Sequence, residues 1–319
     1  MSSCSQSSQW SGWVAILNIP TLIASISPVL LGISLASMRQ TNIDHSVSVL
    51  CLITALFLQV SVNFANDYFD WKNGIDTKEH LGPHKPIVEG SVGPTLVLYS
   101  SLASLGLAFC SILTLLCQTR LWLFSPLAIL FLLLPLAYSG GSYPLANWGV
   151  GEVTVLTFFG WVPSLGTFYC LTKSWSSDAF FLGSGSGFIS ATLLLTNNIR
   201  DMETDSISGK YTLPWILSSH YARWFRWMHY FLSSDIPVPF YAPLLLHKMF
   251  LLGSLLMPLL ASSLGWRWIF LLYLYPLSGS FKLLRKAVLA NKDRILWDQA
   301  FSSTGKLFFL YLLLFFLSV

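Results

Sequence analysis

A short polar segment at residues 63–76 carries asparagines and aspartates at a spacing that suits metal chemistry. If a helix continues through it, four oxygen-bearing side chains share one face, because they stand at positions i, i+3, i+4 and i+7. These four are Asn63, Asn66, Asp67 and Asp70. Gly74 then lets the chain leave the helix, since glycine readily adopts left-handed backbone conformations, and Asp76 returns toward the same face.

A second segment, residues 196–205, repeats this pattern farther along the chain. Asn197, Asp201 and Asp205 stand at i, i+4 and i+8, again as one stripe on a helix. Two carboxylate stripes that face each other would repel unless positive charge lay between them. Mg²⁺ fits best, because it prefers oxygen ligands and retains sites for water and phosphate.

The expected anion at this metal is a diphosphate that bridges the two stripes. Arg200 and Lys210 adjoin the second segment and would counter the remaining phosphate charge. The alternative for each segment is a solvated acidic loop. Loop charges are usually scattered, whereas these are phased to one helical face and begin where an apolar stretch ends, which favours a site.

The composition indicates that the chain is dissolved in lipid. Of the 319 residues 54% are hydrophobic and only 10% charged, whereas a soluble domain carries about 25% charge. The net charge is +4 and no basic stripe with interleaved aromatic residues occurs, so nucleic-acid binding is not expected. The five cysteines stand singly and lack metal-ligand spacing.

Nine apolar segments are predicted to cross the membrane as helices around a central cavity, which makes the chain an all-α, multi-pass bundle. Most are long enough, or nearly so, for a hydrocarbon core roughly 30 Å thick. The predicted spans are 16–38, 47–63, 95–117, 121–138, 150–171, 179–195, 249–264, 268–281 and 307–319.

The basic residues predict the orientation of these spans. With the N-terminus inside, all but four of the eighteen Lys and Arg residues fall on the cytoplasmic side, as the positive-inside rule requires. The four exceptions are Arg39, Arg120, Lys173 and Arg267. We therefore expect a protein of the cytoplasmic (inner) membrane whose two polar segments face the cytoplasm.

The two segments resemble the aspartate-rich motifs of the UbiA superfamily of intramembrane prenyltransferases. Further motifs are similar to those of the 1,4-dihydroxy-2-naphthoate polyprenyltransferases of menaquinone synthesis. They comprise Leu81-Gly82-Pro83, Tyr138-Ser139-Gly140-Gly141, Gly149-Val150-Gly151-Glu152, Asn197-Asn198-Ile199-Arg200-Asp201 and Gly209-Lys210. The resemblance covers most of the chain and implies one UbiA-type domain over residues 1–319.

The resemblance implies a reaction and a set of site residues. Polyprenyl diphosphate would donate its prenyl group to 1,4-dihydroxy-2-naphthoate, with Mg²⁺ and with loss of CO₂, to give demethylmenaquinol. The expected metal ligands are Asn66, Asp67, Asp70, Asp76, Asn197, Asp201 and Asp205. The expected catalytic residues are Asp70, Asp201 and Tyr138, and the expected diphosphate-binding residues are Asn63, Lys85, Arg200 and Lys210. Partners would be these two substrates and membrane lipid, with no obligate protein partner.

Several alternatives remain open at this point. Lys85 stands where the family usually has an arginine, and Asn18-Ile19-Pro20-Thr21 replaces a basic-Pro-basic stretch. These departures leave the acceptor open, so 1,4-dihydroxy-6-naphthoate, 4-hydroxybenzoate and homogentisate are alternatives. Glu152 could reach the acceptor or cap a helix. A cation-coupled transporter is the remote alternative, although its carboxylates would lie near the bilayer midplane.

Overall fold

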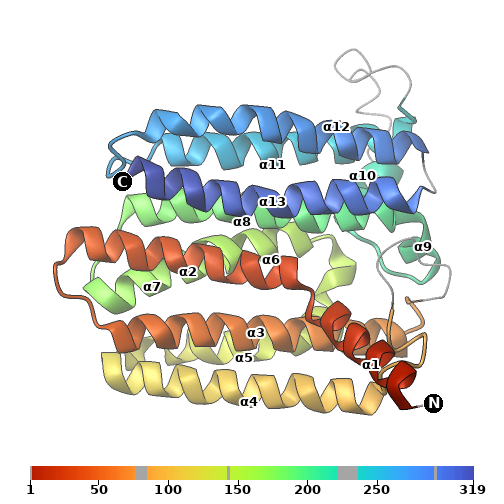
Figure 1. Cartoon of the computed structure of the whole chain (residues 1–319), viewed down its shortest axis with the longest axis horizontal. Helices are drawn as coiled ribbons and strands as arrows, with labels where there is room; N and C mark the ends of the chain where they lie inside the picture. Colours follow the sequence, from red (N-terminus) through yellow and green to blue (C-terminus); the bar gives the residue numbers. More distant parts are fainter. Residues whose placement is uncertain (1, 77–84, 142–143, 221–235, 291–292) are drawn as a thin grey trace.

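The computed structural model describes residues 2–76, 85–141, 144–220, 236–290 and 293–319, and every regular element in these ranges is helical (Figure 1). The predicted all-α class is confirmed. The motif Leu81-Gly82-Pro83 lies outside the described residues. The principal helices are α1 (Ser2–Leu17), α2 (Ile19–Arg39), α3 (His45–Lys72), α4 (Pro94–Thr119), α5 (Ser125–Ser139), α6 (Gly151–Leu156), α7 (Val162–Thr172), α8 (Ser177–Arg200), α9 (Met202–Ile207), α10 (Leu213–His220), α11 (Tyr241–Leu259), α12 (Leu274–Ala290) and α13 (Arg294–Ser318).

The long helices lie side by side with nearly parallel axes, and α8 runs through the middle of the bundle (Figure 1). In its most apolar stretch 78% of the residues are buried, against 44% or less in the other spans. The helix packs against α2, α6, α11 and α13. Because other helices surround α8, the second polar segment, which begins in its last turns, lies inside the bundle.

Small residues allow a close contact between helices. The helix of α6 and α7 contains one π-helical turn, η3 (Thr157–Trp161), and there it meets α8. A Cβ atom on Gly160 would lie 2.7 Å from the carbonyl oxygen of Gly183 and 2.9 Å from the Cα of Gly187. Glycine on both helices therefore permits backbone contact, as is common between membrane helices.

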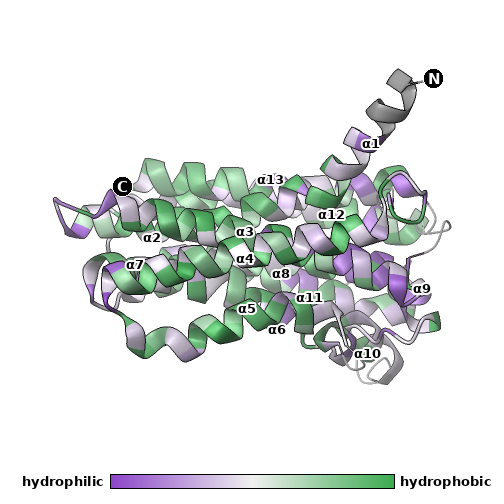
Figure 2. Ribbon diagram, turned by 90° about the horizontal axis from the view of Figure 1, so that it is seen from below, coloured by the Kyte–Doolittle hydropathy of each residue, from purple (hydrophilic) through white to green (hydrophobic). Residues whose placement is uncertain are grey.

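Within the described residues, eight helices are long and apolar enough to cross a membrane. Figure 2 shows hydrophobic residues along these helices and hydrophilic residues toward their ends, many of them near α9. The multi-pass prediction is thus supported, but the count of nine is not confirmed. The predicted span 268–281 lies in η6 (Arg267–Tyr273) and α12, which is basic in its second half at Lys282, Arg285 and Lys286.

Two predicted helix starts were wrong. Helix α11 begins at Tyr241 rather than 249. The polar residue His247 does not interrupt this helix, because its side chain is fully buried and its Nε2 lies 3.2 Å from Thr196 Oγ1. Helix α13 begins at Arg294 rather than 307. Asp293 caps it by accepting hydrogen bonds from the backbone N–H groups of Ile295 (3.0 Å) and Leu296 (3.2 Å).

Candidate active site

The first polar segment forms the last turns of α3 and the turn that follows. The helix continues to Lys72, as predicted, and Gly74 then adopts a φ of 70°. The backbone N–H of Asp76 donates to the carbonyl oxygen of Asp70 at 3.2 Å. The chain thereby folds back, and Asp76 is buried beside the helix that carries Asp67 and Asp70.

The second segment covers the end of α8 and the short helix α9. The two helices meet at Asp201, whose backbone leaves the helical conformation (φ −92°, ψ 3°). Asp205 N–H donates to the carbonyl oxygen of Asp201 at 2.8 Å, and Lys210 N–H donates to that of Asp205 at 2.9 Å. These two bonds turn the chain so that both aspartates and Lys210 approach the same space.

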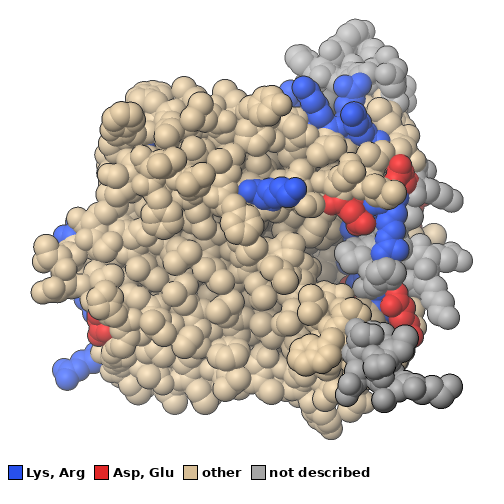
Figure 3. Space-filling model, in the orientation of Figure 1, with Lys and Arg blue, Asp and Glu red and all other residues tan. Residues whose placement is uncertain are grey.

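That space is a cavity of about 440 Å³ at the end of the bundle where α3 and α8 end. Figure 3 shows acidic and basic side chains gathered at this end, while the described atoms across the middle of the face are almost all uncharged. Every site residue predicted from the sequence lines the cavity. They are Asn63, Asn66, Asp67, Asp70, Asp76, Lys85, Tyr138, Asn197, Arg200, Asp201, Asp205 and Lys210.

Two lysines lie between the carboxylates. Lys85 Nζ is 2.9 Å from Asp76 Oδ2 and 3.2 Å from Asp67 Oδ1. Lys210 Nζ is 3.4 Å from Asp205 Oδ2 and 3.9 Å from Asp70 Oδ2. The positive charge that two facing carboxylate stripes require is therefore supplied here by lysine ammonium groups.

Burial of these groups shifts their pKa values. Desolvation raises the pKa of Asp76 to about 6 although Lys85 opposes it, and it raises that of Asp205 to about 6 against the opposing charge of Lys210. Burial alone lowers the pKa of Lys85 and Lys210, but the neighbouring carboxylates outweigh it and raise both above the usual value. Both lysines are therefore charged at neutral pH.

Two other predicted diphosphate-binding residues are already engaged. The Arg200 guanidinium donates to both carboxylate oxygens of Asp201, from Nε at 2.8 Å and from Nη2 at 2.7 Å. Asn63 Nδ2 donates to the carbonyl oxygen of Leu17 at 2.7 Å and its Oδ1 accepts from Gln59 at 2.7 Å. The Asn63 amide therefore anchors α1 to α3, and a role in supporting the cavity suits it better than contact with a diphosphate.

A buried carboxylate behind the cavity wall belongs to Glu152, for which the sequence left contact with the acceptor and a helix cap as alternatives. Glu152 is 1% exposed; its Oε1 accepts from Asn198 Nδ2 at 2.9 Å, and within the described residues its Oε2 has no hydrogen-bond partner. Asn198 and Tyr138 both line the cavity. The local signal was Gly151-Glu152, an acid in a helix with no other charged residue, but its pairing with Asn198 depends on how α6 packs on α8.

Within the described residues, no three His, Cys, Asp or Glu side chains converge on a point that could hold a metal ion. The donor chemistry nevertheless fits Mg²⁺, which proteins usually bind through one or two carboxylates while substrate phosphates and waters fill the other positions. Asp205 Oδ2 is buried without a hydrogen-bond partner in this part of the chain and faces only the Lys210 ammonium at 3.4 Å, so a metal cation could take the place of that ammonium.

Comparison with known proteins identifies the family to which this site belongs. The model of the UbiA prenyltransferase family matches residues 25–313, which is most of the chain. The chain belongs to the UbiA prenyltransferase family. The resemblance inferred from the two polar segments is thereby confirmed. Membership also removes the basis for the transporter alternative.

The relatives of this UbiA-family chain include bacterial enzymes named 1,4-dihydroxy-2-naphthoate octaprenyltransferase. The Haemophilus influenzae enzyme is 36% identical over 56% of the chain, and the Bacillus subtilis enzyme is 32% identical over 63%. These matches span 59% and 63% of the relatives' own lengths. A UbiA homolog from Archaeoglobus fulgidus, solved with DMAPP and Mg²⁺, has a similar fold (TM-score 0.54, 11% identity, 93% of this chain and 99% of that one).

Proposed function

We propose that this chain transfers a polyprenyl group from polyprenyl diphosphate to 1,4-dihydroxy-2-naphthoate and releases diphosphate and CO₂. The observation that carries the proposal is the single cavity into which both polar segments bring carboxylates, with Lys85 and Lys210 between them. The names of the bacterial relatives support the choice of acceptor. Other aromatic acceptors, including 1,4-dihydroxy-6-naphthoate, 4-hydroxybenzoate and homogentisate, are outcomes that the experiment below distinguishes.

The proposed metal site uses oxygen ligands from both segments. Asp70 of the first and Asp201 and Asp205 of the second would hold Mg²⁺ together with the donor's phosphate oxygens, as the family's solved relative with DMAPP and Mg²⁺ suggests by analogy. When bound, Mg²⁺ would neutralise charge on the diphosphate and so make it a better leaving group. The aspartates would orient the diphosphate at the end of the cavity nearest the loops.

The lysines would then exchange partners. Lys85 and Lys210 neutralise aspartates in the absence of substrate, and we infer that they turn to the diphosphate when it binds, because their ammonium groups lie within 4 Å of the carboxylates concerned. A protonated lysine beside a leaving diphosphate stabilises the charge that develops as the allylic C–O bond breaks. The bond's electron pair leaves with the diphosphate.

The acceptor would lie on the side of Tyr138 and Asn198. Glu152 holds the amide nitrogen of Asn198, so the amide oxygen is free to point into the cavity and accept a hydrogen bond from a naphthol hydroxyl. Such a bond increases electron density in the ring and favours attack on the allylic carbon. Because the new C–C bond replaces the carboxyl group, which departs as CO₂, no net proton transfer is required.

Apolar side chains would receive the prenyl chain and exclude water. The cavity wall includes Ile16 and Ile19 near the junction of α1 and α2, Leu194 of α8 and Phe301 of α13. Water must be kept away because it would trap the allylic cation as an alcohol. This wall therefore supports a substrate with a long apolar tail rather than a water-soluble donor.

The membrane orientation is also a proposal. Arg39 and Lys173 lie at the bundle end opposite the cavity, where Arg39 Nη1 donates to the carbonyl oxygen of Trp175 and Lys173 Nζ to that of Thr119. Most other basic residues lie toward the cavity end, which by the positive-inside rule supports a cavity on the cytoplasmic side of the inner membrane.

The direct test is a reaction with purified protein in lipid nanodiscs. The protein would receive Mg²⁺, a polyprenyl diphosphate and an equimolar mixture of the four aromatic acids, and the products would be identified by mass. We expect prenylated 1,4-dihydroxynaphthalene that has lost CO₂. A product formed from another of the acids would identify that acid as the acceptor in place of the proposed one. The absence of any prenylated product would contradict the proposed activity.

A further inference from the structure

A basic residue stands in the middle of a lipid-facing helix. Lys306 is the central residue of α13, twelve positions after Arg294 and twelve before Ser318, so it lies about 18 Å from either end. Its side chain is exposed, and within the described residues it forms no ion pair. An ionisable group at such depth in a membrane is costly, which makes a dedicated partner the first explanation to test.

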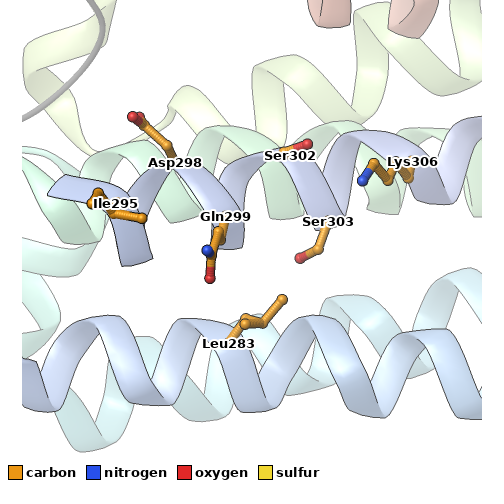
Figure 4. Close-up of a pocket in the computed structure, with 7 residues that line it drawn as sticks. All are labelled: Leu283, Ile295, Asp298, Gln299, Ser302, Ser303 and Lys306. Carbon is orange, nitrogen blue, oxygen red and sulfur yellow. The ribbon is translucent and has the colours of Figure 1, made fainter. Parts of the chain in front are cut away.

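Lys306 lies in a groove of about 400 Å³ between α12 and α13. Figure 4 shows its amino group directed back along α13 toward Ser302 and Ser303, while Leu283 of α12 forms the opposite wall. Ser303 is already engaged, since its Oγ lies 2.9 Å from the carbonyl oxygen of Ala300 and 3.3 Å from Ser280 Oγ. Ser302 and Gln299 have no such partners in the described part of the chain, and both line the groove.

The groove is separate from the active-site cavity. Phe301 of α13 faces that cavity, whereas Ser302 and Lys306 line the groove on another face of the same helix. Beyond Lys306 the exposed stripe becomes apolar at Phe309 and Leu313, which are 59% and 53% exposed and stand three and seven positions later. The helix surface thus changes from polar to apolar away from the cavity end, as an amphiphile does from head to tail.

We propose that this groove binds an acidic phospholipid, with its phosphate at Lys306. The Lys306 ammonium and the hydroxyl of Ser302, one turn earlier on the same helix, are donors that suit phosphate oxygens. A ligand that approaches from lipid must have an apolar body, and the exposed side chains beyond Lys306 offer it a surface. Asp298 lines the far end of the groove, two turns from Lys306, and its charge would keep the phosphate at the Lys306 end.

An acidic headgroup is the specific expectation. Phosphatidylglycerol carries its negative charge without a compensating ammonium, so its full attraction to Lys306 is retained. In phosphatidylcholine a choline cation lies beside the phosphate and offsets this attraction. The lipid would also fill the groove between α12 and α13, beside the hydrogen bonds that Ser280 makes with Thr304 (2.9 Å) and Ser303 (3.3 Å) of α13.

Native mass spectrometry of detergent-solubilised protein tests the proposal. The protein would be incubated with phosphatidylglycerol or phosphatidylcholine, and with glycerol phosphate as a headgroup without tails. We expect wild type to retain phosphatidylglycerol about tenfold better than phosphatidylcholine, and Lys306→Met to lose this preference, because one charge-assisted contact has that effect. Lys282→Met, which removes an exposed lysine of α12 outside the groove, should bind like wild type.

Each contrary result bears on the proposal. Equal retention of both lipids by wild type would overturn it, and this comparison needs no variant to fold. Unchanged selectivity in Lys306→Met would also overturn it, because the lysine would then only extend toward the membrane surface. Glycerol phosphate binding as tightly as the lipid would show a site for free phosphate instead. Prenyl transfer by the variant is a separate measurement, so this outcome is independent of the proposed activity.

Discussion

Lys210 Nζ lies 3.9 Å from Asp70 Oδ2 and thereby joins the two polar segments, which the chain separates by several helices. The same ammonium lies 3.4 Å from Asp205 Oδ2. One lysine thus neutralises a carboxylate from each segment at the point where we propose that a metal and a diphosphate bind. Substrate and metal would therefore compete with protein cations for the same aspartates.

Replacing Lys210 by alanine leaves Asp70 and Asp205 close together without their shared ammonium. We expect the variant to bind the prenyl donor about ten- to a hundredfold more weakly, since a charge-assisted contact is worth about 1.5–3 kcal/mol. Its melting temperature should also fall, and Mg²⁺ should raise it more than in wild type because the cation replaces the lost charge. Thermal unfolding with and without Mg²⁺, beside Lys282→Ala as control, measures this. A Mg²⁺ effect equal to that in wild type would contradict the prediction.

Loss of a proposed metal ligand should stop turnover without unfolding the chain. Asp70→Asn and Asp201→Asn each preserve side-chain volume, and we expect turnover to fall by about a hundredfold or more because each removes a charge that orients the leaving group. EDTA should abolish wild-type activity and Mg²⁺ restore it. Product formation by mass spectrometry, together with size-exclusion elution, checks both effects. Full activity in chelator would refute the metal-dependent mechanism.

Lys85 could contact either substrate. It bridges Asp67 and Asp76, so we expect it to bind the diphosphate; Lys85→Ala should then raise the donor KM about tenfold and leave acceptor preference unchanged. If it instead binds the acceptor carboxylate, the variant loses discrimination among aromatic acids. Lys85→Arg, the residue usual in the family, should retain donor binding. Wild-type kinetics in Lys85→Ala for both substrates would mean that the lysine only balances charge.

Glu152 should act through Asn198 and not by touching substrate. In Glu152→Leu the Asn198 amide loses the acceptor that holds its nitrogen, so we expect acceptor kcat/KM to fall about tenfold while donor KM is unchanged. Glu152→Gln retains an oxygen for Asn198 Nδ2 and should remain near wild type. Steady-state kinetics with each substrate varied in turn distinguish the two. Equal loss in both variants would indicate instead that the charge itself is needed.

The contact at Gly160 should be sensitive to one added methyl group. Gly160→Ala places a Cβ atom 2.7 Å from the carbonyl oxygen of Gly183, a backbone atom that cannot move aside cheaply, so we expect destabilisation of about 1–3 kcal/mol. Gly166→Ala is the matched control on α7, because no atom outside its own helix backbone lies within 4 Å of its new Cβ. Thermal unfolding of both variants measures the difference.

Much of the site could be predicted because helical periodicity is a local property. Asn66 and Asp70 lie one turn apart in α3, and the sequence spacing alone places them on one face. The turn at Gly74 was likewise predictable, since its positive φ suits glycine. The starts of α11 and α13 were not, because polar residues interrupt the apolar pattern of each helix: His247 in α11, and Asp298 and Lys306 in α13. Only the burial of His247 and the cap formed by Asp293 explain why the helices extend past them.

The sequence by itself thus determined the helical class, the membrane character and the polar residues of the two segments that line the cavity. Only the tertiary structure decided which of them pair: Lys210 with Asp70, and Glu152 with Asn198. Such pairs join distant parts of the chain, and their geometry depends on how the helices pack and how the loops close, which no local pattern encodes. The position of Lys306 in a groove between α12 and α13 was settled in the same way, because a residue's neighbours in the membrane are set by helix packing.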